Sequence, residues 1–241
     1  MKNIKKLLLL ITLCLPMVSS ADCEKWIDQL LEKYHSSRES DMPVCKIWPA
    51  DESKTIVVLP FPRGSDDSIF YDLDVLLIDT QSGEVIAHNW EPDAFVSDAI
   101  QLVGFGIDTA RYQLNNESRA FGVRVGFRGS SSVYPFYEQQ INLYVQQNEK
   151  LNRIVNQLVL KTSGGEMYNC KGEFHNNDAV LLLGNSSTNN FKDLIVSDKE
   201  QKGIIKVNSE GECVEEITES TKREYILYYN GVEYPLPEPI Y

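Results

Sequence analysis

Arg124 and Arg128 stand in the segment RAFGVRVGFRGSSS (residues 119–132), where apolar residues alternate with arginine or glycine. Successive side chains of a β-strand point to opposite faces, so both arginines are expected on one face and the apolar residues on the other. Glycines at 122 and 126 flank Arg124 in its own row, and we expect open space beside its guanidinium. The paired N–H donors of that group suit a carboxylate or a phosphate. The buried row would consist of Phe121, Val123, Val125 and Phe127.

Two interpretations of this arginine row remain open. The arginines bind an external ligand, or an acid on a neighbouring strand pairs with them in an ordinary cross-strand ladder. The acids considered for that pairing are Asp72, Asp74 and Glu138.

Three aromatic residues follow in SSVYPFYEQQ (residues 131–140). Aromatic side chains combine a large contact area with polar groups, so these rings could contact a sugar or a peptide, although filling the core is their alternative fate. Together with the arginines they form the predicted recognition surface, which consists of Arg124, Arg128, Tyr134, Phe136 and Tyr137.

Acidic residues provide the alternative chemistry. Hydrolysis of a glycoside requires only two suitably separated carboxyl groups and leaves no compact motif. Asp72 and Asp74 share one strand face, Glu166 follows a Gly-Gly pair, and Asp66 and Asp67 lie in a predicted loop. A carboxylate-dependent hydrolase is therefore the second hypothesis.

Other catalytic signatures are missing from the sequence. The G-x-S-x-G nucleophile motif, the H-E-x-x-H zinc motif and the glycine-rich nucleotide-binding loops do not occur. His35, His88 and His175 have no serine or cysteine arranged beside them as a nucleophile system. We expect no catalytic set of these kinds, no cofactor and no metal site.

The N-terminal segment is typical of an export signal. Lys2, Lys5 and Lys6 precede an apolar run at residues 7–18, and small residues follow up to Ala21. We predict a signal peptide at residues 1–21 and a mature, periplasmic or secreted chain that does not insert into a membrane. Its removal leaves 20 basic and 35 acidic side chains, a net charge near −15. Such a charge argues against DNA or RNA as a partner, because nucleic-acid binding depends on cationic contacts.

Four cysteines remain after the predicted cleavage. An even number in an exported chain indicates disulfides. Of the three possible pairings we favour Cys23 with Cys45 and Cys170 with Cys213, because each bridge then closes its own end of the chain. The cysteines lack the C-x-x-C spacing that zinc sites use.

The rest of the sequence predicts β-structure. An amphipathic helix is expected at residues 22–37, and from residue 54 onward short runs of β-branched and aromatic residues alternate with turn residues. Turns are expected in DTQSGE, QQNEK, DKEQKG and YYNGVEY, the last as a tight Asn-Gly hairpin. We predict one disulfide-linked, mainly antiparallel β domain at residues 22–241, arranged as a two-layer sandwich; a propeller-like ring is the alternative. The expected strands are 55–61, 71–79, 83–90, 119–127, 140–147, 153–162, 178–184, 192–198, 203–207 and 224–236.

An ordered series of motifs resembles a family of exported proteins of Gram-negative bacteria with no assigned activity. The likeness covers residues 43–237 and implies an envelope setting without transferring any catalytic residue. The motifs are SDAIQL (97–102), DTARYQL (108–114), RAFGVR (119–124), SGGEMYNCKGEF (163–174), DLIV (193–196) and YILYYNGVEYPLP (225–237).

These observations favour an exported, non-catalytic binding or interaction module. Its expected partner is a protein, peptide or glycan of the cell envelope. The alternative is the carboxylate-dependent hydrolase, acting on envelope glycans.

Overall fold

The computed structural model describes residues 21–65 and 68–237. The predicted signal peptide lies outside the described residues except for Ala21, and so do Asp66 and Asp67. Helix α1 (Ala21–Tyr34) comes first, followed by eleven strands in the described chain. The strands are β1 (Val44–Ile47), β2 (Lys54–Ser65), β3 (Ser68–Asp79), β4 (Val85–Ser97), β5 (Ile100–Gln113), β6 (Arg119–Gly129), β7 (Phe136–Gln147), β8 (Lys150–Tyr168), β9 (Lys171–Thr188), β10 (Phe191–Val207) and β11 (Cys213–Leu227).

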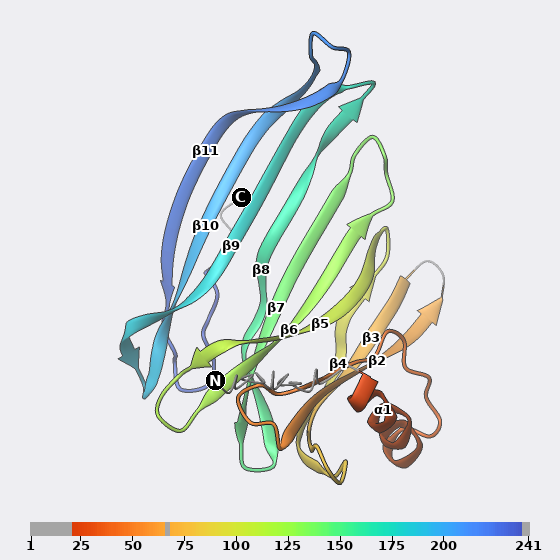
Figure 1. Cartoon of the computed structure of the whole chain (residues 1–241), viewed down its shortest axis with the longest axis vertical. Coiled ribbons are helices and arrows are strands. Elements are labelled where there is room, and N and C mark those ends of the chain that lie inside the picture. The colour runs from red at the N-terminus through yellow and green to blue at the C-terminus, as the bar shows by residue number, and fades with distance from the viewer. Residues whose placement is uncertain (1–20, 66–67, 238–241) are drawn as a thin grey trace, which may run out of the picture.

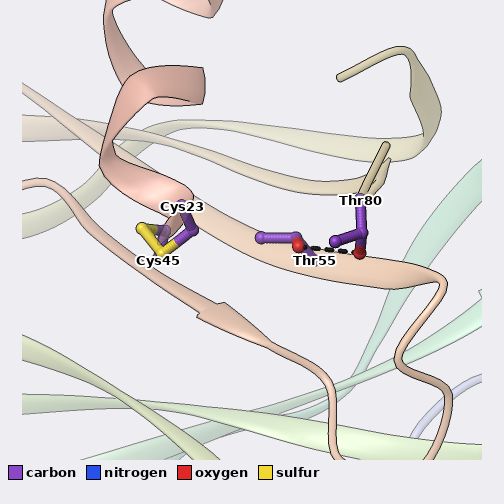
Figure 2. Close-up of a disulfide and its surroundings, with 4 residues drawn as sticks. All are labelled: Cys23, Cys45, Thr55 and Thr80. Atoms are coloured by element: carbon purple, nitrogen blue, oxygen red, sulfur yellow. Dashed lines mark hydrogen bonds between the residues drawn. A yellow bond between two sulfur atoms is a disulfide. The ribbon is translucent and has the colours of Figure 1, made fainter. Parts of the chain in front are cut away.

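The predicted N-terminal helix is confirmed. Its apolar stripe, Trp26, Ile27 and Leu30, is buried against the outer face of β2 and β3. The disulfide between Cys23 and Cys45 joins the first turn of α1 to β1 (Figure 2). Beside it, the hydroxyl groups of Thr55 in β2 and Thr80, the residue after β3, are hydrogen-bonded at 3.0 Å (Figure 2).

The strands form one large, open sheet, and the predicted mainly β, mostly antiparallel structure is confirmed. Its order is β1-β2-β3-β4-β8-β7-β6-β5, and β9, β10 and β11 continue it from the other part of β8. The parallel contact joins β4 to β8 through a single residue pair, His88 with Lys150. Figure 1 shows the long strands β8 to β11 running side by side and extending away from the end that carries α1. Residues 21–65 and 68–237 do not form a ring of separate small sheets, which was the propeller alternative.

One core lies between two layers of this sheet. It contains side chains from β2 to β4, such as Leu73 and Val75, and the apolar row of β6. Phe121, Val123, Val125 and Phe127 are all buried there, with Phe121 packed between the rings of Trp48 and Tyr144. The alternation in residues 119–129 therefore places the two arginines on the opposite side of β6, as expected.

A second core covers another part of the sheet. Ile141, Leu143 and Val145 of β7 pack with Leu194 of β10 and with Tyr234 in the segment that follows β11. Because Tyr144 belongs to the first core, residues 141–145 of β7 are buried on both faces, which suits the apolar side chains of this short stretch.

Three local predictions are wrong. Strand β5 contains residues that we did not assign to a strand, and DKEQKG lies inside the continuous strand β10 instead of forming a turn. The turn at Asn230 does form, with a backbone bond from its N–H to the carbonyl of Glu233, but no returning strand follows it. The chain continues instead to Tyr234, whose N–H bonds to the carbonyl of Ile154.

Candidate functional site

The guanidinium of Arg124 binds a carboxylate within the chain. Its Nη2 lies 2.6 Å and its Nε 2.9 Å from Oδ2 of Asp108, while Nη1 donates to Oε1 of Gln139 at 2.7 Å. Asp108 is on β5, so the cross-strand interpretation applies to this arginine, although with a different acid from the three considered. The space expected beside Gly122 is occupied, because a Cβ there would stand 2.6 Å from Cδ1 of Ile141.

Arg128 has a different environment. Its side chain is exposed and makes no hydrogen bond or ion pair to the part of the chain that the structure describes. It lies at a groove of about 420 Å³ whose lining includes two more predicted residues, Phe136 and Tyr137. We call this feature the Arg128 groove.

The other wall of the Arg128 groove comes from strands that are distant in sequence. Met167, Phe174 and Ile205 add apolar surface, and Glu215 of β11 also lines it. The ring of Phe174 lies across Gly203 of β10, where a Cβ would stand 2.4 Å from its Cζ. A glycine at this position therefore allows the ring to lie against the sheet.

The predicted surface is thus only partly brought together. Arg128, Phe136 and Tyr137 line one groove, and Arg124 is held by Asp108. Tyr134 is 59% exposed, and its hydroxyl donates to Oε1 of Glu166 at 3.4 Å. Sequence reasoning missed Met167, Phe174 and Ile205, because no local pattern indicates that β8, β9 and β10 pass beside β7.

The acids of the hydrolase hypothesis are surrounded by cationic or aromatic groups. Asp72 is buried and accepts hydrogen bonds from Nη1 of Arg38 and Nε of Arg63, each at 3.1 Å, and from the backbone N–H of Asp93 at 2.9 Å. Asp74, also buried, lies 2.9 Å from Nε2 of His35. Two arginines therefore compensate the charge of Asp72, whereas the contact of Asp74 is to an imidazole.

The rings of Phe61 and Trp90 lie beside the partners of these acids. Ring centroids lie 4.4 Å apart for His35 and Phe61, and 5.7 Å apart for His35 and Trp90. The guanidinium of Arg38 stands 4.8 Å from the centroid of the Trp90 ring, within cation–π range. These side chains cover the outer face of β3 in part, and a pocket of about 260 Å³ remains beside His35, Asp74 and Trp90.

The ionisation of Asp72 decides its chemistry. Burial raises the pKa of its carboxyl, but the hydrogen bonds from Asp93 and Arg63, the charge of Arg63 and the bond from Arg38 outweigh burial and hold that pKa below its ordinary value. A proton donor in glycoside hydrolysis needs the opposite shift. Glu166, the other acid singled out, is exposed near the β8–β9 turn.

We expect the free energy of unfolding to depend on pH through Asp72. Because its pKa is lower in the folded chain, its contribution is complete above the unfolded value of about 3.8 and is lost as the pH falls through the folded pKa. The variant Asp72→Asn should lower the free energy of unfolding by about 1–3 kcal/mol at neutral pH. Its free energy of unfolding should also fall less steeply than that of the wild type on the acid limb, the part of the curve where stability decreases with falling pH. Urea unfolding between pH 2 and 7 measures both effects. An unchanged acid limb would contradict the assignment.

Neither a metal cluster nor a membrane span is found in the described chain. Within residues 21–65 and 68–237, no group of three or more His, Cys, Asp or Glu side chains is arranged to hold a metal ion. No helix in these residues is both long and apolar enough to cross a bilayer. The predicted disulfide pairs, Cys23 with Cys45 and Cys170 with Cys213, are confirmed.

Comparison of the chain with protein-family models, with curated proteins and with solved structures finds no match. The functional argument therefore depends on the geometry of the chain itself.

Proposed function

We propose that this chain is an exported binding module of the bacterial cell envelope, acting in the periplasm or after secretion. In this proposal the Arg128 groove holds a peptide or glycan segment that carries a carboxylate on a partly apolar body. The N-terminal sequence supports export, and two disulfides suit an oxidising compartment. The likeness to exported proteins of Gram-negative bacteria supports the envelope setting.

The observation that carries the proposal is the guanidinium of Arg128, which has no partner among the residues that the structure describes. The chain has 35 acidic and 23 basic residues, and the neighbouring Arg124 has taken an internal carboxylate. Arg128 instead presents its donors beside Phe136 and Tyr137. A guanidinium beside aromatic surface suits a ligand with one anionic group and an apolar part.

The net negative charge of the chain does not prevent such binding. Interactions between exposed charges are largely screened beyond about 8 Å at physiological ionic strength. A hydrogen bond to a charged group contributes roughly 1.5–3 kcal/mol at contact. The local pairing with Arg128 therefore outweighs the long-range repulsion, although the acidic surface should slow the approach of an anion at low salt.

A panel of peptides and oligosaccharides tests the proposal. It contains acidic peptides with aromatic or aliphatic neighbours, their amidated forms, and uronic-acid oligosaccharides, and binding is followed by fluorescence polarisation. We expect acidic members to bind and Arg128→Ala to weaken that binding by roughly 10- to 150-fold, the equivalent of one charged hydrogen bond. Arg128→Lys should restore part of the affinity.

Arg124→Ala is the matched control, because it removes the same charge from the same strand. It should lower stability, since Asp108 loses its partner, and leave affinity for the acidic ligands within about twofold of the wild-type value. Equal loss of binding in both arginine variants, or binding that does not distinguish acidic from amidated ligands, would contradict the proposal.

A further inference from the structure

A second concave site lies where β4 and β8 separate. After the single residue pair between His88 and Lys150 the two strands diverge, and a cleft of about 720 Å³ opens between them. Residues 89–94 of β4 form one wall, and the other consists of Leu151, Asn152, Arg153, Asn156 and Gln157 of β8. The segment after β11, including Gly231 and Glu233, closes a third side.

Both walls are shaped by β-bulges. In β4, residues 92–94 stand opposite Asp72 alone, and in β8, residues 156 and 157 stand opposite Asn142 alone. Asp93 and Gln157 have positive φ angles of 50° and 52°, a conformation that costs non-glycine residues energy and occurs often at functional sites. Bulges redirect side chains and are common beside binding sites.

The two bulges are joined to each other. Nε2 of Gln157 donates to the carbonyl of Ala94 at 3.0 Å, which connects the β8 bulge to the β4 bulge across the cleft. The backbone N–H of Gln157 donates to Oδ1 of the buried Asn142 at 2.6 Å, which fixes the β8 bulge. The cleft walls are therefore held in place before any ligand arrives.

A buried ion pair forms part of the cleft lining. Glu91 is 7% exposed and pairs with Nη1 of Arg153, and Nδ2 of Asn89 donates to its Oε1 at 2.5 Å. Burial raises the pKa of Glu91, an effect that Arg153 partly opposes. Arg153 makes no other side-chain hydrogen bond to the described residues, so its Nε and Nη2 donors remain for a ligand.

The cleft contains both hydrogen-bond donors and acceptors that have no partner in the described chain. Asn152 and Gln157 use their Nδ2 and Nε2 groups in internal hydrogen bonds, and among the described residues their side-chain oxygens have no donor. The same holds for Oδ1 of Asn89, and the amide of Asn156 is exposed without an internal partner in the described chain. Hydroxyl groups, which both donate and accept, match this arrangement.

Most charged side chains of the cleft are already paired within the described chain. Glu91 is neutralised by Arg153, and Asp93 pairs with Arg63. A cation would find only the exposed carboxylate of Glu233 without a partner in the described chain, whereas an anion would meet an excess of acids. The uncharged hydrogen-bonding groups dominate.

We propose that the cleft between β4 and β8 binds an uncharged, polyhydroxylated ligand, a short neutral oligosaccharide. Its volume falls within the range of known ligand pockets. This site is separate from the Arg128 groove, so each can be tested without the other.

The experiment uses the mature, disulfide-bonded chain and isothermal titration calorimetry. The probes are neutral tetrasaccharides of glucose and of N-acetylglucosamine, with a tetramer of glucuronic acid and one of glucosamine as charged counterparts. Each titration is repeated with the Arg128→Ala variant, so that binding of the glucuronic acid tetramer in the Arg128 groove is not counted. In that variant we expect a neutral tetrasaccharide to bind and both charged tetramers to bind at least tenfold more weakly. No binding of any neutral tetrasaccharide, or stronger binding of a charged one to Arg128→Ala, would overturn the proposal.

Variants test whether the neutral tetrasaccharide binds in the cleft between β4 and β8. The double variant Asn152→Ala and Asn156→Ala should weaken binding at least tenfold, and Asn156→Trp should block it by filling the cleft. Asn116→Ala, which changes an exposed asparagine away from the cleft, is the matched control and should bind like the wild type. Thermal unfolding verifies that each variant is folded; full affinity in folded cleft variants would overturn the assignment.

A variant of one site serves as the control for the other site. Arg128→Ala should leave binding of the neutral tetrasaccharide unchanged, and the Asn152 and Asn156 double variant should leave binding of acidic peptides unchanged. Failure of one proposal therefore does not imply failure of the other.

Discussion

Replacing Phe121 with alanine is expected to lower the free energy of unfolding by about 3–5 kcal/mol, near the upper end for single core substitutions. The ring is 1% exposed and lies between Trp48 and Tyr144, with centroids 5.8 Å from each. Its removal leaves a cavity between the two layers of the sheet, and close packing around the site prevents full collapse.

Urea denaturation followed by tryptophan fluorescence measures this effect. Phe70→Ala is the matched control, because Phe70 lies on β3 but is 38% exposed, and it should cost no more than about 1 kcal/mol. Equal destabilisation by the two variants would mean that the apolar row of β6 does not face the core.

The double variant Cys170→Ser and Cys213→Ser is expected to lose roughly 4 kcal/mol of stability. The bridge joins the β8–β9 turn to the first residue of β11 across 43 residues of sequence, and the chain-entropy model gives a larger effect for longer loops. Removing Cys23 and Cys45, which are 22 residues apart, should cost roughly 3 kcal/mol.

Unfolding curves of the oxidised wild type, the reduced wild type and the two double variants test this prediction. The reduced wild type should be less stable than either double variant, because it lacks both bridges. Stability that does not change on reduction would show that the bridges add nothing to the folded chain, and the argument from disulfides to an oxidising compartment would lose its energetic basis.

Much of the fold could be predicted because its strands carry local signals. The period-two pattern of residues 119–129 predicted the buried face of β6, and the β-branched and aromatic residues of 140–147 predicted the strand that forms β7. The helix of residues 21–34 followed from its apolar spacing. These features depend on residues that are close in sequence, so they could be predicted without knowing the order of the strands in the sheet.

Other strands lack such signals. β5 contains Gly104 at a φ of 154° and Gly106, which weaken its strand pattern. The outer parts of β10 and β11 are mostly exposed on both faces, so they show little apolar alternation and depend on main-chain pairing and on ion pairs such as Lys206 with Glu216. A strand with both faces in solvent has a largely polar sequence, which resembles that of a loop.

The candidate sites were predictable only where one strand defines them. The alternation placed Arg124 and Arg128 on the solvent side of β6, but the partner of Arg124 is set by the register of β5, which the local pattern did not reveal. Phe174 and Ile205 enter the Arg128 groove through the order of β8, β9 and β10. The cleft between β4 and β8 depends on two bulges, which leave no recognisable motif.

The most direct measurement of the central claim is a titration of nitrogen-15 labelled chain with an acidic peptide, with the Nε–Hε signals of individual arginines followed by NMR. The Nε signal of Arg128 should shift and saturate with the same dissociation constant as overall binding. The Nε signal of Arg124 should not shift, because this group already donates a hydrogen bond to Asp108. A bound peptide that leaves the Arg128 signal unmoved would contradict the account.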